Sequence, residues 1–165
     1  MNIQYTSSVF AESYCQAVDA VARERKYLGS TEGFPLESTV AFVQMIEAKN
    51  LAQYYAIENN RVVGWCDIIP KHYEGLNHVG VLGMGLLPDY RGKGLGRVLL
   101  TKTIGHACDI NHLEKVELEV FESNITAISL YCKLGFTLEG KREHGRKLDG
   151  VYDNILLMSR FLIRQ

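Results

Sequence analysis

Hydrophobic residues along this chain follow two periods, one typical of helices and the other typical of strands. Apolar side chains recur every three or four positions in four segments, which predicts helices over residues 11–28, 36–49, 95–109 and 124–134. Alternating or short apolar runs predict strands over residues 2–9, 51–58, 61–69, 79–87, 116–120, 136–140 and 151–161. Asn59-Asn60 predicts a hairpin turn, and residues 141–150 predict a basic hairpin tip. This mixed order of elements indicates an α/β fold.

The stretch from Leu82 to Gly96 joins a predicted strand to a predicted helix and is rich in glycine. Arg91, Gly94 and Gly96 stand in the pattern Arg-x-x-Gly-x-Gly just before that helix. Because glycine has no Cβ, backbone N–H groups can approach a ligand closely, and a helix N-terminus favours an anion. With the charges of Arg91 and Lys93, the stretch predicts a pyrophosphate-binding turn. An ordinary tight turn is the alternative, and the spacing matches neither a Walker loop nor a Rossmann fingerprint.

Length and composition narrow the class of protein. The 165 residues are 47% hydrophobic, which suits a single domain over residues 1–165. The net charge of −1 gives no support for binding to nucleic acid or to a membrane surface through bulk charge. The sequence shows no basic-then-apolar leader and no apolar run of about 20 residues, and its 4 cysteines are widely spaced. We therefore expect a cytoplasmic protein with reduced thiols. The 5 histidines show no ligand spacing, so no metal is expected.

A second motif follows the predicted strand at residues 116–120. Asn124 begins the pattern Asn-x-x-Ala-x-x-Leu-Tyr, which ends at Tyr131 and is followed by x-x-Leu-Gly-Phe. Together and in this order, the two motifs resemble those of the GNAT superfamily of N-acetyltransferases. Residues 24–36 and 150–158 are similar to the group that holds phosphinothricin and L-amino-acid N-acetyltransferases. The resemblance implies acetyl-CoA as co-substrate and a central mixed, mostly antiparallel β-sheet of about six or seven strands, flanked by about four helices.

The resemblance also implies roles for residues at matching positions. Tyr131 would be the general acid that protonates the departing CoA sulfur, and Glu119 would be the general base. Glu32 and Phe34 would lie on the acceptor side. The acetyl-CoA-binding residues would be Met84, Gly85, Leu86, Arg91, Gly92, Lys93, Gly94, Leu95, Gly96, Asn124 and Ala127.

Simpler interpretations of these residues stay open. Asn124 could serve only as a helix N-cap, Tyr131 only as a core aromatic, and Glu119 only as part of a solvated strand face. The loop that holds Glu32 could be an ordinary turn.

The chemistry of amide formation favours a small primary amine as the acceptor. An α-amino group with a pKa near 7.7–8.0 is roughly one-tenth neutral at pH 7, whereas a lysine amine costs about 4.6 kcal/mol to deprotonate. The sequence shows only modest basic machinery, so we predict acetyl transfer to a small metabolite such as an amino acid, with a homodimer as a further expectation. The alternatives are a catalytically silent acyl-CoA-binding module and a protein N-terminal acetyltransferase.

Overall fold

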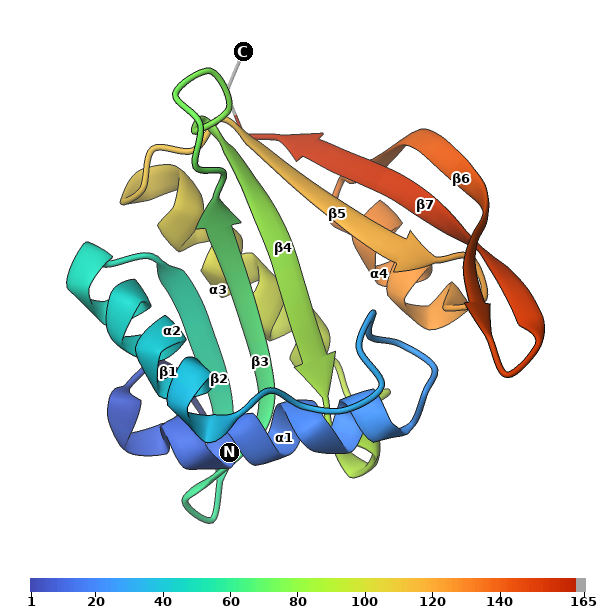
Figure 1. Cartoon of the computed structure of the whole chain (residues 1–165). Coiled ribbons are helices and arrows are strands. Elements are labelled where there is room, and N and C mark those ends of the chain that lie inside the picture. Colours follow the sequence, from blue (N-terminus) through green and yellow to red (C-terminus); the bar gives the residue numbers. More distant parts are fainter. Residues whose placement is uncertain (163–165) are drawn as a thin grey trace.

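The computed structural model describes residues 1–162, which form one seven-stranded sheet with helices on both faces (Figure 1). The sheet order is β1-β2-β3-β4-β5-β7-β6. Only β4 and β5 pair in parallel, so the predicted mixed, mostly antiparallel sheet is confirmed. The strands are β1 (Asn2–Tyr5), β2 (Ala52–Glu58), β3 (Arg61–Pro70), β4 (Val79–Leu86), β5 (Lys115–Phe121), β6 (Thr137–Leu148) and β7 (Val151–Phe161). The helices are α1 (Ala11–Arg23), α2 (Leu36–Lys49), α3 (Leu95–Asp109) and α4 (Ile125–Lys133), with 3-10 turns η1 (Ser8–Phe10) and η2 (Pro88–Tyr90).

Two layers of helix cover the sheet, with α1 and α2 on one face and α3 and α4 on the other (Figure 1). On the first face, the ring of Tyr14 on α1 packs against the rings of Tyr55 and Trp65. On the second face, Leu99 of α3 is fully buried, and a Cβ at Gly64 of β3 would lie 3.3 Å from it. Because successive strand residues point to opposite faces, odd-numbered residues of β3 and β4 face α1, as do those of β2 up to the bulge at Ala56/Ile57.

Several predicted elements are confirmed with their boundaries. Helices α2 and α3 have the predicted ends, and Asn50 closes α2 in the left-handed conformation with φ of 50°. Asn59 and Asn60 both have positive φ, 49° and 60°, as a tight hairpin turn between β2 and β3 requires. Local sequence therefore determines these boundaries.

Two N-terminal predictions are wrong. The first strand ends at Tyr5 rather than at residue 9, because the Ser7 hydroxyl accepts a hydrogen bond from the Val9 N–H and starts η1. Helix α1 ends at Arg23 rather than at residue 28. Arg25 has φ of 58°, and the Arg146 side chain donates to its carbonyl. A contact 121 residues away in the chain thus helps to fix the backbone here.

The predicted basic tip at residues 141–150 is also wrong. β6 continues through Leu148, and only Asp149 and Gly150 form the turn, with φ of 51° and 77°. Shifts of register interrupt the pairing of β6 with β7 between Leu138 and Gly140 and between Arg142 and Arg146. These irregularities hide the alternating pattern that would have marked a long strand.

Candidate functional site

Strands β4 and β5 form a fork in the middle of the sheet. They pair only from Val79 with Lys115 to Val81 with Glu117, although β4 continues to Leu86. Beyond these pairs the two strands diverge (Figure 1). The backbone groups that would bond to a neighbouring strand are therefore left for another partner.

Two hydrogen bonds show which backbone groups of β4 face the fork. The Leu87 N–H donates to the Val63 carbonyl, and the Val79 carbonyl accepts from Lys71, so odd-numbered positions of β4 face β3. Even-numbered positions face the other way, because strand backbone groups alternate in direction. Met84 and Leu86 thus direct their N–H groups into the fork.

Gly85, a predicted acetyl-CoA-binding residue, directs its backbone groups differently from Met84 and Leu86. It lies opposite Trp65 in the register, and its N–H and C=O groups face β3 rather than the fork. A Cβ at Gly85 would collide with the Trp65 indole ring, at 2.4 Å from Cη2. The glycine at this position accommodates the indole ring.

The glycine-rich turn at the end of β4 is left-handed at two glycines. Gly92 and Gly94 have φ of 72° and 80°, and no atom lies within 4 Å of a Cβ built at either. Gly94 is the N-cap of α3 and provides no side-chain cap. The N–H groups of Leu95, Gly96 and Arg97 make no hydrogen bond to any residue of the range 1–162. Free donors at a helix N-terminus favour an anion.

Gly96 serves packing as well. A Cβ there would lie 3.3 Å from Cδ2 of Leu130 on α4 and 3.6 Å from Cε of Met84. Its absence lets α3, α4 and β4 pack closely on one face of the sheet.

The predicted basic residues of the turn are engaged within the protein. Arg91 donates to both carboxylate oxygens of Glu24, at 2.9 and 2.6 Å, and its Nε donates to the Leu86 carbonyl at 2.9 Å. Its guanidinium also lies 4.7 Å from the centre of the Tyr27 ring. Lys93 Nζ donates to the Asp89 carbonyl at 2.8 Å. The Arg91 side chain therefore braces the end of β4 against the end of α1, and backbone N–H groups are the free donors of the turn.

Helix α4 brings the second motif to the fork. Asn124 is its N-cap, with Oδ1 accepting from the Ala127 N–H at 3.3 Å, so these two groups satisfy each other. Tyr131 is 7% exposed and its ring packs against Phe136 at 5.8 Å. Its hydroxyl makes no hydrogen bond to another described residue. Burial raises the pKa of this hydroxyl, and the nearby Cys66 raises it further to a smaller extent. Tyr131 therefore keeps its proton at neutral pH.

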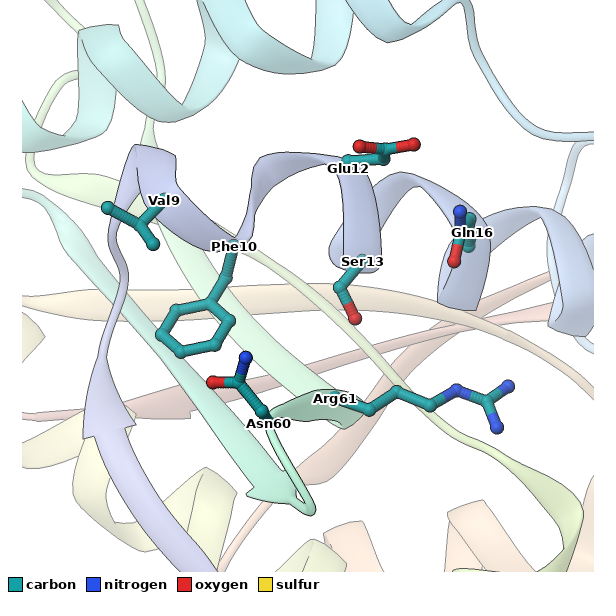
Figure 2. A pocket seen from close by; sticks show the side chains of 7 residues that line it. All are labelled: Val9, Phe10, Glu12, Ser13, Gln16, Asn60 and Arg61. Atoms are coloured by element: carbon teal, nitrogen blue, oxygen red, sulfur yellow. The ribbon is translucent and has the colours of Figure 1, made fainter.

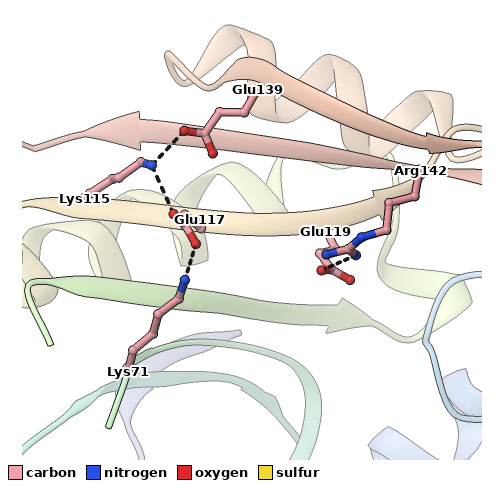
Figure 3. A network of polar contacts seen from close by, with 6 residues as sticks. All are labelled: Lys71, Lys115, Glu117, Glu119, Glu139 and Arg142. Atoms are coloured by element: carbon pink, nitrogen blue, oxygen red, sulfur yellow. Dashed lines mark hydrogen bonds and ion pairs between the residues drawn. The ribbon is translucent and has the colours of Figure 1, made fainter. Parts of the chain in front are cut away.

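Three carboxylates lie on the α1 face of the sheet around the fork. Glu117 binds Lys71 at 2.6 Å and Lys115 at 3.0 Å, and the hydrogen bond to Lys71 lowers its pKa (Figure 3). Glu119, the predicted base, is 56% exposed at its side chain and binds Arg142 at 2.6 Å. The third carboxylate, Asp67 on β3, is buried.

A pocket of about 260 Å³ adjoins Glu119 at the open end of the fork. The Arg146 guanidinium covers the Phe121 ring at 4.2 Å and donates to the carbonyls of Arg25 and Lys26. The β6–β7 hairpin is thus fastened to the segment after α1. The pocket is lined by Tyr27, Gly29, Glu119, Val120, Phe121, Gly145, Arg146 and Ile155.

The predicted acceptor residues lie elsewhere. Glu32 is exposed and Phe34 is 60% exposed, and neither lines this pocket. The same loop contributes Tyr27 and Gly29 instead. The contacts of Glu24, Tyr27 and Arg146 could not be read from local sequence, because their partners lie 64 to 121 residues away.

A second hollow, of about 360 Å³, lies between the start of α1 and the β2–β3 turn (Figure 2). Phe10, Ser13, Asn60 and Arg61 are among its lining residues, and none of the predicted site residues is. Within residues 1–162 no group of histidine, cysteine and acidic side chains could hold a metal ion. No helix in the same range is long and apolar enough to cross a membrane.

Comparison with known proteins identifies the family of the chain. The sequence model of the Acetyltransferase (GNAT) family matches residues 18–136, which include both motifs and both strands of the fork. The chain belongs to the GNAT family of acetyltransferases.

Among curated proteins, this GNAT chain is similar to the spermine/spermidine N(1)-acetyltransferase of Bacillus subtilis, with 38% identity over 36% of this chain and 40% of that protein. It is also similar to an N-alpha-acetyltransferase of Saccharolobus solfataricus, with 32% identity over 58% of this chain and 62% of that protein. The aligned regions thus span less than two thirds of these relatives.

Solved structures share the GNAT fold over almost the whole chain. The yncA acetyltransferase of Salmonella typhimurium, solved with its cofactor acetyl-CoA, has a TM-score of 0.92 at 17% identity and covers 100% of this chain and 95% of that one. A phosphinothricin acetyltransferase of Sinorhizobium meliloti, in complex with AcCoA, has a TM-score of 0.90 at 16% identity over 98% of this chain and 88% of that one. At these identities the likeness shows the fold alone.

Proposed function

We propose that this GNAT protein is an acetyl-CoA-dependent N-acetyltransferase that acts on a primary amine of a small metabolite such as an amino acid. One observation carries the proposal: the fork places unpaired backbone donors between a helix N-terminus and a buried tyrosine. The helix N-terminus suits the pyrophosphate of the cofactor, the unpaired strand donors suit the thioester oxygen, and the buried tyrosine suits the departing thiolate.

The residues of the glycine turn fit a pyrophosphate. Gly92 and Gly94 leave open space above the backbone, and the N–H groups of Leu95, Gly96 and Arg97 have no partner within residues 1–162. Acetyl-CoA would supply the activated acetyl thioester. The Leu86 N–H would stabilise the negative charge that builds on the acyl oxygen. It is available for this, because Arg91 binds the carbonyl of Leu86 and not its N–H.

Tyr131 would be the general acid. Its hydroxyl keeps its proton and has no hydrogen-bond partner among residues 1–162, so it is free to donate to the departing sulfur. A thiolate with a pKa near 8.5, by analogy with cysteine, needs only partial proton transfer as the C–S bond breaks.

The pocket beside Glu119 supports a small acceptor. Arg25 binds Asp149 through two hydrogen bonds, at 3.1 and 2.7 Å, and Arg146 donates to the carbonyls of Arg25 and Lys26. These contacts connect the two walls of the pocket, which limits room for a polypeptide. Glu119 would attract the protonated amine into the pocket.

A cytoplasmic location and a homodimer stay predictions.

A thiol-release assay with acetyl-CoA tests this function. The acceptor panel should hold amino acids, diamines and polyamines, and short peptides with free N-termini. We expect turnover with at least one small amine and little with peptides. Preference for peptides would favour the N-terminal acetyltransferase. Acetyl-CoA binding in calorimetry without turnover on any acceptor would favour the silent module.

A further inference from the structure

Asp67 is a buried carboxylate for which the proposed reaction has so far no use. It lies on β3, is 8% exposed, and makes no ion pair within the part of the chain that the structure describes. Its Oδ2 accepts one long hydrogen bond, 3.4 Å, from Gln53 on β2. A buried carboxylate with so little compensation is costly, so its presence here calls for an explanation.

The position of Asp67 relates it to the fork. It lies opposite Gly83 in the register of β3 and β4. A Cβ at Gly83 would be only 3.2 Å from Asp67 Oδ1, so the carboxylate leans over the backbone of β4. Gly83 comes two residues after Val81, the last β4 residue that pairs with β5. Asp67 Oδ1 therefore lies above the point where the two strands separate.

The free oxygen of Asp67 is not sealed from solvent. Among residues 1–162, Asn111 Oδ1 is the one fully enclosed side-chain polar atom without a hydrogen bond. Asp67 Oδ1 also makes no hydrogen bond to these residues. Since it is not among the fully enclosed atoms, part of its surface is accessible. It is therefore in contact with space that a water molecule can reach.

Register also places Asp67 relative to the other groups of the site. Paired residues share a face, so Asp67, Gly83, Val81, Glu117 and Glu119 all point toward the α1 side. Met84 points to the opposite side, where its Cε and the Cδ2 of Leu130 on α4 both lie close to Gly96. A carboxylate and Tyr131 thus approach the fork from opposite faces of the sheet, as a base and an acid on the two sides of one acyl group would.

We propose that Asp67, acting through a water molecule at the fork, accepts the proton that the acceptor ammonium must lose. This inference rests on the proposed function. The ammonium gives one proton through water to Asp67, and the amine lone pair then bonds to the acetyl carbon. The carbonyl electrons move to oxygen and return as the C–S bond breaks, while the sulfur takes the Tyr131 proton. The nitrogen's second proton passes to solvent, from which the phenolate is reprotonated, and Asp67 gives its own proton back to solvent.

Asp67 suits this task better than the other two carboxylates of the face. Glu117 is held by two lysines and Glu119 by Arg142, so each already has a cation (Figure 3). Burial raises the pKa of Asp67 to about 7, where a base is most effective at neutral pH.

The groups around Asp67 favour this state. The titratable groups that face it are Tyr14 from α1 and Tyr55 from β2, and Asp67 contributes to raising the pKa of both. Cys66 is its neighbour on β3, and burial raises the pKa of that thiol. None of these three groups carries charge near pH 7.

The test is a pH–rate profile of Asp67→Asn with the best acceptor. Removing a base of this kind should lower kcat/KM by roughly 10- to 100-fold near pH 7. The loss should shrink to a few-fold near the pKa of the amine, where neutral acceptor is abundant. Acetyl-CoA affinity, measured by calorimetry, should stay within about twofold.

Two further variants separate catalysis from structure. Thr6→Val removes the 2.6 Å hydrogen bond to Gln53 and perturbs the same buried network while leaving the carboxylate. It should lower the melting temperature without changing the shape of the pH profile. Gly83→Ala keeps Asp67 but places a methyl group 3.2 Å from Oδ1, so it should repeat the pH-dependent loss.

Clear outcomes overturn the proposal. A profile of Asp67→Asn that matches the parent, or one that is lowered equally at every pH, would exclude Asp67 as the proton acceptor. If Asp67→Asn does not fold, Gly83→Ala decides by the same criterion. Failure of the parent to turn over any amine would instead contradict the proposed function.

Discussion

The two arms of the fork use different chemistry. The arm formed by β4 and α3 presents backbone, because its glycines leave the N–H groups open and the Arg91 side chain is engaged by Glu24 and the Leu86 carbonyl. The arm formed by β5 and α4 presents side chains, with Tyr131 buried on one face and Glu119 exposed on the other.

This difference separates binding from chemistry. A backbone donor cannot be removed by changing its own side chain. Substitutions on the first arm therefore act by changing the backbone conformation or by filling the space above the N–H groups. The second arm is altered by exchanging a single functional group. Substitutions on the first arm should therefore change acetyl-CoA affinity, and those on the second should change turnover or acceptor affinity.

The largest expected effect is that of Tyr131→Phe. General acid catalysis typically contributes about 10²–10⁴-fold, and we expect a loss in kcat in the lower half of that range because a thiolate leaves fairly well unaided. The hydroxyl has no hydrogen-bond partner among residues 1–162, and the ring that packs on Phe136 is kept, so stability should change little. The measurement is steady-state thiol release from pH 6 to 9, with the KM for acetyl-CoA staying within a few-fold. An unchanged rate would make Tyr131 a core aromatic only.

Gly94→Val should weaken acetyl-CoA binding by about 10- to 100-fold, which corresponds to losing one hydrogen bond to a charged group. Valine at φ of 80° is strained, so the turn must change conformation and move its N–H groups. Calorimetry measures the affinity. Gly75→Val is the matched control, because its Cβ also meets no atom within 4 Å but its φ is not left-handed. Equal affinities in the two folded variants would contradict the assignment of the turn.

Features of the fork that depend on local conformation could be predicted from the sequence, whereas those that depend on distant partners could not. The glycine turn before α3 and the cap at Asn124 depend on local conformation, which short motifs encode, so the sequence indicates both. The brace of Arg91 on Glu24 depends on a partner 67 residues away, for which no local pattern exists. The role of Gly85 depends on the Trp65 ring across the strand pair, so it too could not be predicted.

Variants of the Glu24–Arg91 pair test whether Arg91 belongs to the brace or to the cofactor site. As a brace, the pair should show a coupling of about 1 kcal/mol in a double-mutant cycle of Glu24→Gln and Arg91→Met followed by denaturant unfolding. Glu24→Gln alone should leave acetyl-CoA affinity within about twofold. Tighter binding in Glu24→Gln together with about tenfold weaker binding in Arg91→Met would show instead that the freed guanidinium binds the pyrophosphate.

The smallest expected effect is that of Glu119→Gln, and it bears on the division of labour among the carboxylates. Glu119 is exposed and paired with Arg142, so its attraction for an amine is screened by water and salt. We expect the KM for the acceptor to rise roughly three- to tenfold at low salt, less at high salt, with kcat within twofold.

Glu139→Gln is the control for Glu119→Gln. It removes a carboxylate from the same sheet, but this carboxylate pairs with Lys115 and does not line the pocket. It should leave both kinetic constants unchanged. If Glu119→Gln instead lowers kcat most at low pH, with the KM for the acceptor unchanged, Glu119 is the base that the resemblance implies. Asp67 would then be a buried structural carboxylate, and both faces of the second arm would take part in proton transfer.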